Sequence, residues 1–157
     1  MSSATGRQRG TPPSVAARRA GYVVSVLVNA GLLWFVNAWP GWRTVPFLTE
    51  EMASVVPLVN ASLTAAVVAN TVFLVHDPPW LEALGDLMVT AVGLVAVVAM
   101  WRTFPFEFDD GGLDWDVVVR VLLVLAIAGS VIGIGVDVVR LVAGARRAPS
   151  HQPGTSP

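Results

Sequence analysis

Four long apolar segments constrain this chain more than any other feature of its sequence. They cover about residues 21–39, 52–75, 81–101 and 117–143, close to the ~20 residues that an α-helix needs to cross a bilayer. Because hydrocarbon offers no water, a spanning segment must satisfy its backbone N–H and C=O groups internally. Of all residues, 54% are hydrophobic and 13% charged, against about 25% charged in ordinary soluble domains. The sequence therefore predicts an all-α integral membrane protein, with four transmembrane helices in an up-down bundle.

The segments outside these predicted helices are short and polar. Residues 1–19 and 145–157 contain few apolar side chains to bury, so we expect two disordered tails. Residues 20–144 then form a single four-helix transmembrane domain. One alternative concerns the first apolar segment, because residues 1–38 resemble a signal peptide that ends at a cleavage site. Cleavage there would leave three spans.

Arginine supplies all of the basic side chains, since the chain has no lysine. Most of the arginines precede the first predicted helix or follow the last one. Cytoplasmic segments of membrane proteins carry an excess of basic residues, so we predict a plasma-membrane protein with both termini in the cytoplasm. The arginines on this side are Arg7, Arg9, Arg18, Arg19, Arg140, Arg146 and Arg147, and those on the other side are Arg43, Arg102 and Arg120.

Each predicted helix also carries one strongly polar residue near its predicted cytoplasmic end. An Asp at the centre of a membrane helix costs about 2.5–3.5 kcal/mol on insertion scales, so such carboxylates usually face protein or water. At 3.6 residues per turn, Asp137 shares a face with Ser130 and Gly133, and Asp86 shares one with Thr90. We therefore expect a polar layer inside the bundle. Its members are Asn29, Asn70, Asp86 and Asp137.

Two main interpretations of this layer are open, and a lipid or small-ligand site is a third. Carboxylate and amide oxygens are ligands for hard cations, so Asp86, Asp137 and the two asparagines are candidates for binding a cation or carrying a proton. Alternatively, the layer holds the helices together. Asp137 then pairs with Arg140 three residues later, and Asp86 meets Arg18 or Arg19 from the first helix. We favour this structural interpretation, because interhelical hydrogen bonds are a common use of polar residues in membrane bundles.

The predicted outer loop between the third and fourth helices is strongly acidic. Such a loop is a candidate for capturing Ca²⁺ or concentrating cations, although its spacing is not that of an EF-hand. The simpler expectation is a solvated loop on the side that the arginines avoid. The carboxylates are Glu107, Asp109, Asp110, Asp114 and Asp116.

Several classes of activity lack the residues that they need. Without cysteine there is no thiolate chemistry, and the two histidines lie in a turn and in a tail, where they cannot ligate a haem in the bundle. The glycines of the fourth segment lie within a membrane helix, so they form no nucleotide-binding loop. The arginines are divided between the ends of the chain, which argues against nucleic-acid binding. We predict no catalytic constellation, no metal site and no cofactor.

The remaining prediction is a structural or accessory subunit in the lipid bilayer. It would form a homo-oligomer or dock on a larger membrane complex. Small residues such as Gly129 and Gly133 let another helix approach closely, either within the chain or from a partner. The alternative is a small cation- or proton-coupled transporter or channel that uses Asp86 and Asp137.

Overall fold

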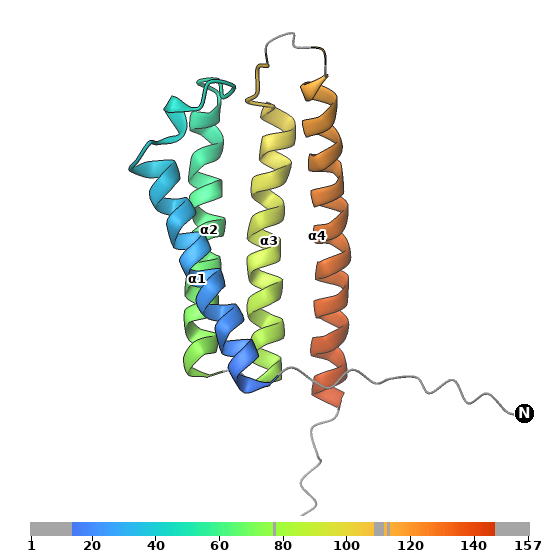
Figure 1. Ribbon diagram of the computed structural model, residues 1–157. Coiled ribbons are helices and arrows are strands. Elements are labelled where there is room, and N and C mark those ends of the chain that lie inside the picture. The colour runs from blue at the N-terminus through green and yellow to red at the C-terminus, as the bar shows by residue number, and fades with distance from the viewer. Residues whose placement is uncertain (1–13, 77, 109–111, 113, 147–157) are drawn as a thin grey trace, which may run out of the picture.

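Four long helices joined by short connections make up the described part of the molecule. The computed structural model describes residues 14–76, 78–108, 112 and 114–146. Successive helices run in opposite directions (Figure 1), and each is long and apolar enough to cross a membrane. The predicted all-α up-down bundle with four spans is therefore confirmed. The elements are α1 (Val15–Asn37), the short 3₁₀-helix η1 (Trp42–Thr44), α2 (Met52–Val75), α3 (Pro79–Thr103) and α4 (Trp115–Arg146).

The helices pack in the order in which they follow one another along the chain. Helix α1 packs on α2, α2 on α3, and α3 on α4; among the described residues, no other two of these four helices pack together. Figure 1 shows α1 crossing α2 at a tilt, with α3 between α2 and α4. The bundle is therefore open, because the two edge helices, α1 and α4, each pack against one neighbour.

The buried core is small and lies mainly on α2. Helix α1 buries none of its side chains, and α4 buries Leu123 and Asp137. Lipid tails are as apolar as leucine, so burying apolar surface gives little driving force between helices in a bilayer. Close packing and hydrogen bonds must hold these helices together instead. The buried hydrophobic residues are Met52, Val55, Ala66, Phe73, Ala83, Ala96 and Leu123.

The closest approach of α2 and α3 depends on a glycine. Gly85 of α3 lies against the outer edge of the Phe73 ring of α2, and a Cβ atom at Gly85 would overlap that ring. The ring is 3% exposed, so it has little room to move. The same ring also meets that of Tyr22 of α1, with ring centroids 5.6 Å apart. Gly85 therefore lets three helices meet at one level.

Far from Gly85, at the other end of the bundle, two of the connections between helices are hydrogen-bonded to each other. The backbone N–H of Thr49 donates to the carbonyl of Pro105 at 3.1 Å, and that of Glu107 donates to Phe47 at 3.0 Å. The rings of Phe47 and Phe108 stack with centroids 5.5 Å apart. These bonds join the α1–α2 connection to the α3–α4 connection, although α1 and α4 themselves do not pack together in the described structure.

The first helix begins earlier than predicted. Helix α1 starts at Val15 because the Ser14 hydroxyl accepts a hydrogen bond from the Ala17 backbone N–H at 3.2 Å, which caps the helix. Residues 15–19 are therefore helical, and the prediction of a disordered tail over residues 1–19 is wrong for them. Helix α4 continues to Arg146, just into the second predicted tail. Residues 1–13 and 147–157 lie outside the described residues.

Candidate functional site

The two asparagines of the predicted layer bond to their own helices. Asn29 donates to the Ser25 carbonyl at 2.8 Å, and Asn70 donates to the Ala66 carbonyl at 2.8 Å. Side chains that bond one turn back in this way satisfy their N–H groups without a neighbouring helix. Within the described residues, neither amide bonds to an aspartate of the layer.

Asp137 lies in the contact between α4 and α3. It is 6% exposed, and its Oδ1 lies 3.4 Å from Nη1 of Arg140, whose side chain is 64% exposed. One turn before Asp137, a Cβ atom at Gly133 would lie 3.7 Å from Cγ2 of Thr90 on α3. The face of α4 that carries Gly133 and Asp137 therefore packs internally, and a guanidinium group at its edge neutralises the buried carboxylate.

Asp86 lies one turn before Thr90 on the face of α3 that meets α4. Because Gly133 meets Thr90 and the two helices are antiparallel, Asp86 and Asp137 lie at a similar level, one turn nearer the same end of the bundle. Its carboxylate accepts no hydrogen bond from any residue that the structure describes. The structure thus brings Asp86 and Asp137 together, as one layer requires, but the ion pair belongs to Asp137.

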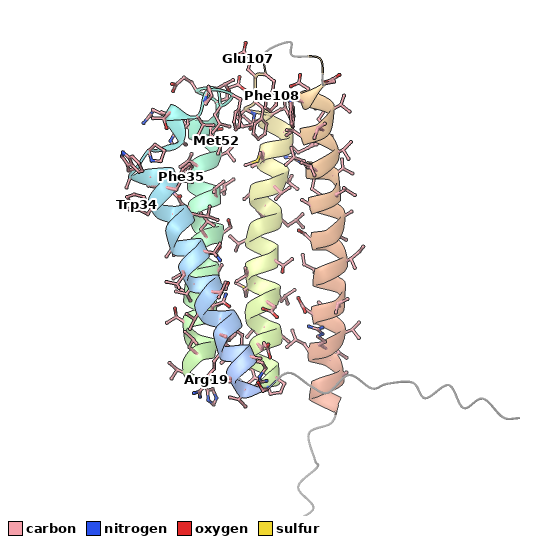
Figure 2. All side chains as sticks on the ribbon, viewed as in Figure 1. Arg19, Trp34, Phe35, Met52, Glu107 and Phe108 are labelled. Atoms are coloured by element: carbon pink, nitrogen blue, oxygen red, sulfur yellow. The ribbon has the colours of Figure 1, made fainter. Side chains whose placement is uncertain are left out.

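The other two predicted partners lie on α1. Arg18 lies just after the Ser14 cap of α1 and has an interaction partner of its own. Figure 2 shows Arg19 at the end of the molecule opposite Glu107 and Phe108. The expected pairing of Asp86 with either arginine stays a prediction.

A cleft of about 450 Å³ opens beside this layer, between the first turns of α3 and the last turns of α4. This volume lies in the range of about 300–1,000 Å³ that is usual for small-molecule sites. Its wall combines apolar surface with both signs of charge. The lining residues are Pro79, Trp80, Glu82, Ala83, Asp86, Arg140 and Leu141.

Glu82 extends the polar group towards α1, a connection that the sequence analysis missed. The Tyr22 hydroxyl donates to Oε1 of Glu82 at 3.0 Å, although α1 does not pack on α3 in the described structure. The available signal was the single tyrosine of the chain, which lies in the first apolar segment. With this bond, polar groups from α1, α3 and α4 gather at one end of the bundle.

A second missed contact joins α1 to α2 in the other half of the bundle. Asn37 and Asn60 exchange two amide hydrogen bonds, each of 2.8 Å. Asn37 also donates to the Leu33 carbonyl at 2.8 Å. Each asparagine was visible in an apolar segment, but their pairing depends on how the two helices are rotated. This is an interhelical hydrogen bond of the kind expected for the predicted layer, at a different place.

The acidic outer loop is described in part. Asp114 accepts a hydrogen bond from the Val117 backbone N–H at 3.2 Å and so satisfies a donor in the first turn of α4. Glu107 and Asp116 are exposed. In the described ranges, no three Asp, Glu, His or Cys side chains are placed to hold a metal ion. The two remaining carboxylates, Asp109 and Asp110, lie outside the described residues.

Comparison with known proteins assigns this chain to no family. The sequence matches no protein-family model, and it is significantly similar to no curated protein and to no solved structure. Four helices of sufficient length and hydropathy carry exposed apolar side chains that suit contact with lipid. The chain is a small multi-pass membrane protein.

Proposed function

We propose that this chain is a non-enzymatic accessory subunit of the plasma membrane that self-associates through the outer face of α4. The observation that carries the proposal is the open bundle. Helix α4 packs on α3 alone among the described helices, so an exposed face of α4 is available to a partner. We define this outer face by residues Leu125, Ala128, Gly129, Ile132, Gly135, Val136 and Val139, all of which are exposed.

The outer face combines large and small residues in a regular pattern. Leu125, Ile132 and Val139 recur every seven residues and are 62%, 68% and 67% exposed. Between them, a Cβ atom at Gly129 or Gly135 would meet nothing within 4 Å. Branched side chains beside open glycines provide the knobs and the holes that closely packed helices need.

Apolar exposure by itself does not support a partner, because lipid solvates leucine and valine well. Small residues do support one, since they let two helix backbones approach and gain van der Waals contact. Two copies in one membrane share an orientation, so a two-fold axis along the membrane normal would bring one outer face against another. The occupant that we propose is therefore a second copy of this chain.

Cysteine cross-linking tests this interface directly, because the chain has no cysteine of its own. We expect Ile132→Cys to form a disulfide-linked dimer in native membranes. The matched control is Val95→Cys, which is 55% exposed on α3. It lies about one helical turn from the depth of Ile132, because Gly133 meets Thr90 and the two helices are antiparallel. Equal cross-linking of both variants, or of neither, would contradict the interface.

A second candidate function is transport of a cation or proton by Asp86 and Asp137. The observation that favours it is the carboxylate of Asp86, which lines the cleft and accepts no hydrogen bond from the described residues. Flux into liposomes tests it with Asp86→Asn and Asp137→Asn, singly and together. Transport predicts that flux falls in the variants, whereas parent flux equal to that of protein-free liposomes would rule it out.

A further inference from the structure

The cleft between α3 and α4 contains more negative charge than its own residues balance. Two carboxylates, Glu82 and Asp86, line the cleft, and the guanidinium of Arg140, which also lines it, already pairs with Asp137. The hydrogen bond that Glu82 accepts comes from the neutral hydroxyl of Tyr22. An ionised carboxylate at membrane depth is costly unless water or a cation solvates it. The charge distribution therefore favours a cationic ligand.

The remaining wall of the cleft indicates what the ligand carries besides charge. Trp80 is 59% exposed and lines the cleft together with Ala83 and Leu141. The indole ring and the neighbouring side chains provide apolar surface. A ligand that satisfies both parts of the wall has a positive head and a hydrocarbon body.

We propose that this cleft binds the ammonium group of an amphiphile. The ammonium lies at Asp86 and Glu82, and the hydrocarbon packs against Trp80 and Leu141. A primary ammonium offers three N–H donors, which two carboxylates can accept. Ca²⁺ needs six to eight oxygen ligands, and the described residues place no group of three side chains around a metal ion. The site does not depend on self-association or on transport.

Equilibrium binding tests this proposal. The full chain in phosphatidylcholine nanodiscs is titrated with octylammonium, and the heat of binding is measured by calorimetry. We expect one saturable site for octylammonium and none for octanol, which has the same chain without the charge. Asp86→Asn should weaken binding by about tenfold or more, because hydrogen bonds to charged groups contribute about 1.5–3 kcal/mol.

The matched control is Glu51→Gln, which neutralises an exposed carboxylate at the other end of the bundle and should leave the affinity unchanged. Trp80→Leu keeps both carboxylates and removes the ring, so it tests the site even if Asp86→Asn fails to fold; we expect it to weaken binding. Equal heats for octanol and octylammonium would overturn the proposal. Unchanged affinity in folded Asp86→Asn or Trp80→Leu would also overturn it.

Two sources of the ammonium group are distinguished by the lipid. If the ligand is the headgroup of an aminophospholipid, nanodiscs that contain phosphatidylethanolamine should compete with octylammonium and weaken its apparent affinity. If the ligand is a soluble amine, phosphatidylethanolamine and phosphatidylcholine nanodiscs should give the same affinity. Either result supports an ammonium site and names its ligand.

Discussion

Amide side chains play two different parts in these helices. Asn29 and Asn70 bond to the backbone of their own helix, whereas Asn37 and Asn60 bond to each other across α1 and α2. The residue type alone does not distinguish the two uses, since every one of these asparagines lies in an apolar segment. The difference is whether another amide faces the side chain.

A double-mutant cycle should measure the Asn37–Asn60 bond. We expect Asn37→Ala and Asn60→Ala to show a coupling free energy of about 0.6–1.7 kcal/mol, the range found for interhelical bonds in membranes. The measurement is unfolding of the purified chain in mixed micelles. Asn70→Ala is the control and should show no coupling to Asn37→Ala. Additive effects of Asn37→Ala and Asn60→Ala would contradict the bond.

A second prediction concerns the pair of Asp137 and Arg140. Arg140→Gln leaves a 6% exposed carboxylate without its partner, so we expect a loss of about 1–3 kcal/mol of stability. Adding Asp137→Asn should recover most of that loss, because the buried group is then neutral. Unfolding of the single and double variants in micelles checks this. A double variant that is less stable than Arg140→Gln alone would refute the pairing.

Replacing glycine by alanine is expected to have opposite effects on stability at two positions of α3. Helix propensity favours alanine over glycine by about 1 kcal/mol in a helix interior. At Gly93, a Cβ atom meets nothing within 4 Å, so that gain is available. At Gly85, a Cβ atom overlaps the ring of Phe73, and the overlap decides the outcome.

We therefore expect Gly85→Ala to destabilise the protein and Gly93→Ala to be neutral or stabilising. Overpacking of a filled core costs about 1–3 kcal/mol, more than the propensity gain at the upper end of that range. Thermal unfolding of the two variants in the same detergent makes the comparison, and each serves as the control for the other. If Gly85→Ala were as stable as Gly93→Ala, the close contact of α2 and α3 would be wrong.

At the scale of the whole molecule, the orientation in the membrane is a prediction from the arginines. Ser14 and Glu107 are both exposed and lie at opposite ends of the bundle. On intact cells, a membrane-impermeant maleimide should label Glu107→Cys but not Ser14→Cys. Opening the membrane should make both react. Labelling of Ser14→Cys alone on intact cells would reverse the orientation.

The number and type of helices follow from the sequence because both are local properties. Each apolar segment is long enough to span the bilayer and must satisfy its backbone bonds within itself. The start of α1 at Val15 was not predicted, because the prediction relied on hydropathy. Hydropathy identifies the part of a helix that lies in hydrocarbon, whereas the cap at Ser14 lies outside it.

The candidate site was predictable in its members more than in its contacts. Helical phase correctly placed Asp137 and Gly133 on a packing face of α4, because that phase needs the sequence of one helix alone. The bonds of Tyr22 to Glu82 and of Asn37 to Asn60 were not predictable in this way. Each joins two helices, so it depends on their relative rotation and depth.

The sequence by itself determined four apolar helices, their alternating directions and the polar residues near one end, since hydrophobicity and backbone bonding act along the chain. The tertiary structure alone decided that the bundle is open and that Asp86 and Asp137 lie at a similar level of adjacent helices. It also decided that Arg140 pairs with Asp137 and leaves Asp86 facing a cleft. These features depend on helix rotation and tilt, which close contacts such as that of Gly85 with Phe73 set across the bundle.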